Sequence, residues 1–86
     1  MKKSLLDIAI MEKVREERKR RKVSQAKLAL EALNLSSYSL ISKIESMEYP
    51  NGYNIEQLNE IALYFKCSLH DFIPVFPIKE KTTGDK

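Results

Sequence analysis

Residues 24–45 read SQAKLALEALNLSSYSLISKIE, and this stretch decides the fold. Ser24 can begin a helix, because its hydroxyl can accept a backbone N–H of the first turn. Apolar residues then recur at helical spacing at Leu28, Ala29, Ala32 and Leu33. Asn34 tolerates the left-handed backbone conformation that ends many helices. The first half of the stretch therefore predicts a helix that begins at Ser24 and stops at Asn34.

The second half predicts another short helix after Leu35, which would form an apolar plug in the turn. Ser36 and Ser37 are candidate N-caps for this helix. Its inward residues would be Leu40, Ile41 and Ile44. Its other face carries Tyr38, Ser39, Ser42 and Lys43. A short polar helix face without acids, supported by a second helix, is suited to insertion into a DNA groove.

A longer helix is predicted upstream, from a capping box at Ser4 and Asp7 to about Arg21. An apolar stripe with a step of three lines one face of it: Leu5, Ile8, Met11 and Val14. The basic residues 19–22 close this helix, where cations are favoured by the helix dipole. They form either a solvated helix end or a contact to a flanking phosphate.

Two further helices are predicted downstream. The first is capped by Asn54 with Gln57, and its core positions are Ile55, Leu58, Ile61, Ala62 and Phe65. The second is a short fifth helix that begins with a capping box at residues 68–71, and Pro74 ends it. Residues 74–78 are predicted to be extended, because two prolines forbid a continuous helix. Their apolar side chains either close over the core or form a partner surface.

Length and composition indicate one small domain with one core, since the chain has 86 residues of which 43% are hydrophobic. We place the domain at residues 4–78 and predict a disordered tail at residues 79–86. No apolar run approaches the roughly 20 residues that span a bilayer, and no secretion signal is evident. The sequence has one cysteine, so it can form no internal disulfide. These features predict a cytoplasmic protein.

The charge is distributed unevenly along the chain. Residues 1–43 hold eleven Lys or Arg and five Asp or Glu, a net charge of +6, whereas residues 44–86 hold four and seven, a net charge of −3. The basic half contains the stretch quoted first. An asymmetry of this kind favours a polyanionic partner, although a solvated helix face would produce the same pattern.

Catalytic and metal-binding patterns are not found, and we predict neither an enzyme nor a cofactor. His70 and Cys67 are the only histidine and cysteine, and no orienting group accompanies them. His70 is expected at the surface and Cys67 in apolar packing. A glycine-rich phosphate loop is excluded as well, because the only glycines are Gly52 and Gly84.

The ordered set of signals over residues 11–74 resembles the XRE family, the Cro/repressor-type helix-turn-helix DNA-binding domains. The residues that carry the resemblance are Arg18, Ser24, Gln25, Leu28, Ala29, Leu35, Ser36, Ile41, Ser42, Lys43, Ile44, Glu45, Leu58, Ile61, Ala62, Phe65, Cys67, Ser68, Asp71 and Phe72. Residues 53–74 also resemble a subset of these regulators seen in Bacteroidetes-like genomes. The resemblance implies an all-α fold of five helices, with the helix-turn-helix at helices 2 and 3.

The resemblance also implies roles for individual residues. Gln25 would contact a backbone phosphate at the start of the second helix. The major groove would be faced by Tyr38, Ser39 and Lys43, with Ser36, Ser37 and Ser42 beside them. Arg18 and Glu45 would form a partly buried ion pair that ties the first helix to the third, because a guanidinium matches a carboxylate with two parallel bonds. The alternative is two separate, solvated side chains.

The sequence departs from the family pattern in length. From Ser24 to Glu45 it is about two residues longer, with one extra residue in residues 30–32 and the other in residues 36–39. Asn34 replaces the usual glycine of the turn. The third helix can therefore begin at either of two neighbouring residues. Tyr38 either contacts DNA or packs back on the domain.

Three functional hypotheses follow. In the first, the chain is a transcriptional regulator that binds double-stranded DNA as a homodimer on a two-fold site, with residues 75–78 as the dimer surface and no membrane partner. In the second, it is a protein-interaction module such as an antitoxin, whose partner is a toxin-like protein. In the third, it is a helical structural domain without a ligand, and its basic half is accidental.

Overall fold

The structure is a computed structural model that describes residues 2–79, and this range contains helices and no strand. The elements in order are α1 (Leu5–Arg20), α2 (Gln25–Lys27), the π-helix η1 (Leu28–Ala32), α3 (Ser39–Ile44), α4 (Ile55–Phe65) and the 3-10 helix η2 (Leu69–Phe72). The prediction of an all-α fold is confirmed. The predicted second helix is α2 continued by η1, and the predicted fifth helix is the single turn of η2.

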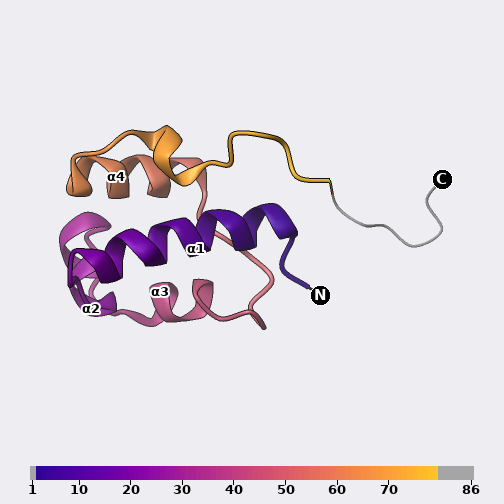
Figure 1. Ribbon diagram of the computed structural model, residues 1–86. Coiled ribbons are helices and arrows are strands. Elements are labelled where there is room, and N and C mark those ends of the chain that lie inside the picture. Colours follow the sequence, from indigo (N-terminus) through magenta and orange to yellow (C-terminus); the bar gives the residue numbers. More distant parts are fainter. Residues whose placement is uncertain (1, 80–86) are drawn as a thin grey trace.

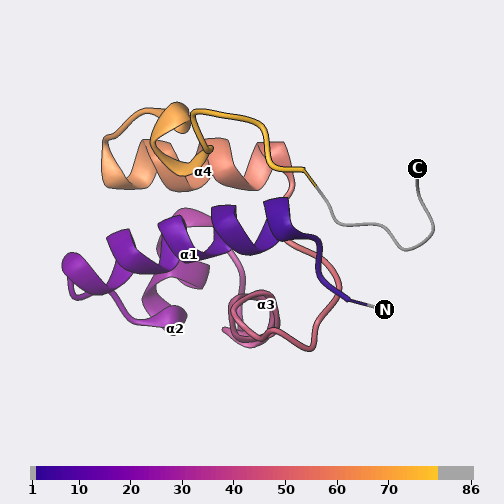
Figure 2. The ribbon, with the colours of Figure 1, turned by 45° about the vertical axis from the view of Figure 1, so that its right-hand side comes forward.

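α1 runs through the middle of the domain. In both ribbon views α4 and η2 lie on one side of it, and α2 and α3 lie on the other (Figures 1 and 2). The helix-turn-helix is formed by α2, η1 and α3, and α1 lies between it and α4. This arrangement leaves one side of α3 facing away from the rest of the chain.

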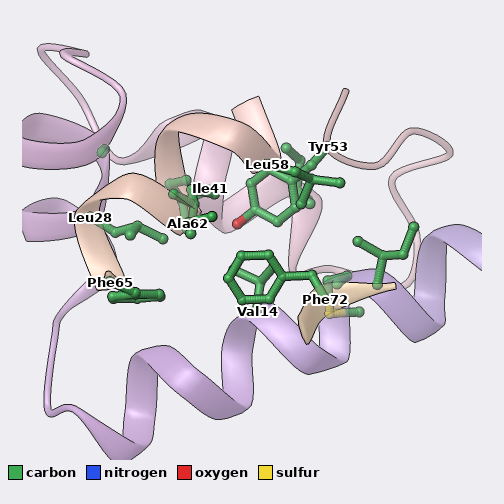
Figure 3. Close-up of a cluster of buried hydrophobic side chains, with 13 residues drawn as sticks. Val14, Leu28, Ile41, Tyr53, Leu58, Ala62, Phe65 and Phe72 are labelled. Carbon is green, nitrogen blue, oxygen red and sulfur yellow. The ribbon is translucent and has the colours of Figure 1, made fainter. Parts of the chain in front are cut away.

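The core consists of apolar side chains from α1, η1, α3, α4 and η2, joined by Tyr53 (Figure 3). Val14, Ile41 and Phe72 are completely buried, and burial of such side chains is the main favourable contribution to folding. Two predicted core residues are not buried: Leu5 is 44% exposed and Ile55 is 58% exposed. Each is the first residue of its helix and lies at the edge of the core.

The helix ends follow the predicted capping residues. Ser4 Oγ accepts the N–H of Asp7 at 3.0 Å. Asn54 and Gln57 form a reciprocal capping box, in which Asn54 Oδ1 accepts the Gln57 N–H at 2.7 Å and Gln57 Oε1 accepts the Asn54 N–H at 2.9 Å. Ser68 starts η2 with a capping box of the same kind. These caps satisfy N–H groups that the first turn leaves without a partner.

The π-helix η1 spans residues 28–32, and the resemblance implies an extra residue within residues 30–32. Leu33 N donates to Leu28 O at 3.4 Å, a bond that spans five residues, and Leu35 N donates to Ala29 O at 2.8 Å. A π-turn holds more residues than an α-turn, so the helix can accommodate an extra residue while Leu28 and Ala29 stay buried. Asn34 then ends it with φ of 56°, as predicted.

Lys66 ends α4 in the left-handed conformation, with φ of 58°. That conformation disfavours a side chain and suits glycine. We expect Lys66→Gly to raise the free energy of unfolding by roughly 0.5–1 kcal/mol, measured by urea denaturation. The matched control is Glu60→Gly, at an exposed position inside α4, which should lower it by about 1 kcal/mol. Equal losses in the two variants would contradict the strain at Lys66.

Residues 74–78 follow η2 as a non-helical segment that bends at Val75 and Phe76, so the predicted extended conformation is not continuous (Figures 1 and 2). Val75 is 90% exposed and Phe76 is 79% exposed, so these two side chains do not close over the core. Of the predicted tail, Lys79 is described and exposed, and residues 80–86 lie outside the described range. Within residues 2–79, no helix is long and apolar enough to cross a membrane.

Candidate nucleic-acid interface

α3 separates apolar and polar side chains cleanly. Ile41 and Ile44 are buried in the core, whereas Ser42 and Lys43 are exposed. The exposed residues between positions 36 and 43 are Ser36, Ser37, Tyr38, Ser39, Ser42 and Lys43. These are the residues that the resemblance places at DNA. They offer hydroxyl groups and one cation, and no carboxylate lies among them.

α3 begins later than predicted, at Ser39, with Tyr38 at the N-cap position. Neither Ser36 nor Ser37 is the N-cap, so that prediction was wrong. Ser37 Oγ instead accepts the Ser39 N–H at 3.1 Å from within the preceding turn. The hydroxyl oxygens of Ser37 and Ser39 are 2.9 Å apart and share a hydrogen bond. Residues 35–38 thus form the connecting turn before α3. Tyr38 is 55% exposed, so more than half of its surface is available to a ligand.

Arg18 and Glu45 form a buried, two-bond ion pair between α1 and the end of α3. Arg18 Nε donates to Glu45 Oε2 and Arg18 Nη2 donates to Glu45 Oε1, each at 2.9 Å. The two side chains are only 9% and 5% exposed. Arg18 Nη1 also donates to the Val23 carbonyl at 2.9 Å, which ties the α1–α2 connection to the same group. The two side chains are therefore not separately solvated.

Gln25 joins this pair from α2. Its Nε2 donates to Glu45 Oε1 at 2.9 Å, so one carboxylate connects α1, α2 and α3. A glutamine amide nitrogen carries two hydrogens, and the bond to Glu45 uses one of them. The second hydrogen can be donated to an external acceptor such as a phosphate oxygen. Glu45 thus holds Gln25 in place, and its own negative charge is compensated inside the domain.

The basic residues 19–22 divide into two groups. Arg20 and Arg21 form ion pairs with Glu17 at 2.6 Å and 3.0 Å, and the Arg21 guanidinium lies 4.7 Å from the Phe65 ring centroid. Their hydrogen bonds lower the pKa of the Glu17 carboxyl. Lys19 and Lys22 are exposed and form no ion pair within residues 2–79.

Sequence reasoning did not select Lys27, an exposed cation of α2. It lies two residues after Gln25, on the helix that would approach the phosphate backbone. No ion pair involves Lys27 or Lys43 in the described part of the chain. The signal that would have found Lys27 is its position in the first turn after the Ser24 cap.

Lys3, which sequence reasoning also missed, anchors the loop that follows α3. It is only 5% exposed, its ammonium donates to the Asn51 carbonyl, and it lies 5.5 Å from the Tyr49 ring centroid. Desolvation by burial lowers its pKa. The contact connects the segment before α1 to the loop after α3. No local pattern indicates it, because the two segments are distant in sequence.

Tyr53 lies in the loop between α3 and α4, and it is buried and belongs to the core. It is 7% exposed, and its ring and hydroxyl lie among the core side chains (Figure 3). The hydroxyl has no hydrogen-bond partner among the described residues. Burial raises the pKa of the phenol, and the negative charge of Glu45 adds to this. Tyr53 therefore stays neutral and acts as a packing residue of the core.

The described residues contain no group of three or more His, Cys, Asp or Glu side chains that could hold a metal ion. The surface around α3 offers hydrogen-bonding hydroxyls, one amide and several lysines. These groups can bind an anionic surface and read hydrogen-bonding partners on it. Their chemistry is that of a binding site.

Comparison with known proteins adds a match of fold. No protein-family model matches the sequence, and no curated protein matches it significantly. Among solved structures, the chain is similar to an HTH_3 family transcriptional regulator from Vibrio cholerae, with a TM-score of 0.65 and 22% sequence identity. The match covers 79% of this chain and 36% of that protein. The helix-turn-helix fold is thus shared with a transcriptional regulator about a third of whose length the chain spans.

Proposed function

We propose that this protein is a sequence-specific DNA-binding transcriptional regulator whose α3 enters the major groove. The observation that carries the proposal is the exposed surface of residues 36–43. It bears hydroxyls and a lysine without a carboxylate, and it is presented on the fold of a helix-turn-helix regulator. The XRE resemblance points the same way. Such a regulator acts by binding, without catalysis, and we place it in the cytoplasm.

In the proposed complex, phosphate contacts position the domain and α3 reads bases. Gln25 donates its second amide hydrogen to a phosphate oxygen, with Lys27 beside it. Tyr38, Ser39 and Lys43 face the groove. Lys43 is the strongest candidate for a base contact, because a lysine ammonium can donate to guanine O6 and N7.

We further propose that the protein acts as a homodimer on a two-fold site. One domain of this size covers few base pairs, and two copies double the sequence that is read. Half-sites would then lie about 34 Å, or one helical turn, apart. The exposed residues Val75 and Phe76 support residues 75–78 as the dimer surface.

Selection of bound DNA from a random pool tests this proposal. We expect an enriched sequence with two-fold symmetry and half-site centres about 10 base pairs apart. The control is Ser42→Asp, which places a carboxylate on the exposed face of α3 and should abolish enrichment. Failure of the unmodified protein to enrich any sequence at low salt would reject the DNA-binding proposal.

A second candidate function is that of an antitoxin, or another protein-interaction module with this fold. The observation that favours it is the exposure of Val75 and Phe76, since exposed apolar side chains in a group mark interaction surfaces. The discriminating observation is a small toxin-like reading frame beside the gene. Its product should co-purify with the chain and be lost with Phe76→Ala.

A further inference from the structure

The C-terminal arm, defined as residues 74–79, is an apolar ligand without a binding site on its own domain. Val75 and Phe76 are the most exposed large apolar side chains of the described chain. Pro74 and Pro77 each fix one backbone dihedral of the arm, and the chain bends between them at Val75 and Phe76. Dihedrals that are already fixed reduce the conformational entropy that is lost on binding.

A groove on the same domain matches this arm in chemistry. It lies between the end of η1 and the N-terminal half of α4 and has a volume of about 700 Å³, within the range of ligand pockets. Its apolar lining residues are Ala32, Leu33, Leu35, Ile55 and Leu69. Its acidic lining residues are Glu56 and Glu60. Uncharged polar side chains complete the lining: Asn34, Asn54, Gln57 and Asn59. The groove is thus of mixed polarity, with an apolar part and a negative edge.

We propose that the arm of one copy docks into the groove of a second copy, and that the exchange is reciprocal. Val75 and Phe76 would cover the apolar lining. Lys79, which follows the arm and is exposed, would face Glu56 and Glu60. This complementarity of charge and apolar surface identifies the occupant of the groove. The inference rests on the homodimer of the proposed function and names how its two copies are held together.

The direction of the arm supports exchange between copies. The arm runs past the N-terminal ends of α1 and α4 (Figures 1 and 2), and Val75 and Phe76 stay exposed on its own domain. Because each copy contributes one arm and one groove, a two-fold dimer can make both contacts at once, whereas docking without reciprocity would form an open chain. Two such contacts would bury about 1,000 Å² in total, which reaches the lower limit for a specific interface.

Disulfide trapping tests the docking site directly. In a Cys67→Ser background, Phe76→Cys is combined with Ile55→Cys in the groove. We expect a covalent dimer on a non-reducing gel after mild oxidation. The control pairs Phe76→Cys with Leu63→Cys, an α4 residue that is 66% exposed and outside the groove, and it should stay monomeric. A disulfide within one chain, no disulfide, or equal trapping in the control would each overturn the proposal.

Sedimentation gives a second measurement. Phe76→Ala should raise the dimer dissociation constant at least about 100-fold, because two buried rings are lost per dimer. Leu63→Ala should leave it unchanged. Lys79→Glu should weaken the dimer, and Glu56→Lys with Glu60→Lys should restore it. An unchanged dissociation constant in Phe76→Ala would reject the arm.

The two proposals fail independently in these experiments. A Lys43→Ala protein that still dimerises but no longer binds DNA supports both the arm and the reading helix. A Phe76→Ala protein that still binds DNA at low salt as a monomer shows that the arm serves dimerisation alone. If the unmodified protein dimerises through the arm and enriches no DNA, the regulator proposal fails and the docking proposal stands.

Discussion

Replacing Glu45 with alanine is expected to lower the free energy of unfolding by about 3–5 kcal/mol, because the change leaves a buried guanidinium without its counterion. Glu45 accepts two hydrogen bonds from Arg18 and one from Gln25. Its removal therefore releases the ties of α3 to both α1 and α2. Urea denaturation followed by circular dichroism would measure the loss.

Two controls separate this effect from a general loss of charge. Glu17→Ala removes an ion-pairing carboxylate that is 29% exposed, and surface pairs contribute at most about 1 kcal/mol. The double variant Arg18→Met with Glu45→Leu replaces the pair by apolar groups and should recover most of the lost stability. A Glu45→Ala protein no less stable than Glu17→Ala would show that the pair contributes nothing.

Replacing Lys43 with alanine is expected to weaken DNA binding by about 10- to 100-fold, the usual effect of losing one specific contact. The pattern of the loss identifies the contact. If Lys43 reads a guanine, discrimination relaxes at one position of the site. If it contacts a phosphate, affinity falls equally for all sequences and the slope of log affinity against log salt decreases by about 1. Titrations with the selected DNA at several salt concentrations distinguish the two.

Lys13→Ala provides the matched control, since Lys13 is an exposed lysine of α1 outside the surface assigned to DNA. It removes the same net charge and should change affinity only slightly. Both variants should retain the circular dichroism spectrum of the unmodified protein, because neither side chain packs in the core. Equal affinities for Lys43→Ala and the unmodified protein would remove α3 from the proposed interface.

Local chemistry along the chain was sufficient for the helices and most of their ends, and the start of α3 was the exception. The caps at Ser4, Asn54 and Ser68 and the stop at Asn34 depend on atoms within a few residues. Apolar spacing was sufficient for most of the core. It failed at Leu5 and Ile55, whose positions at the first turn of a helix turn them away from the core.

The placement of the candidate site depended on contacts between distant segments. Helical periodicity identified the exposed polar residues of α3, such as Ser42 and Lys43. It did not reveal that Gln25 donates to Glu45, since the two are 20 positions apart. Likewise, nothing near Lys3 indicates its bond to Asn51, 48 positions away.

Residues 24–45 show both local sequence signals and contacts with distant segments. Their capping residues, apolar spacing and extra length are local properties. They predict two helices and the exposed polar face of the second one. The π-turn at Leu28–Ala32 and the start of α3 at Ser39 are seen only in the structure. The carboxylate of Glu45 is shared with Arg18 of α1 and Gln25 of α2. Buried side chains must satisfy volume and hydrogen-bond demands set by other segments, and a local pattern does not contain those demands.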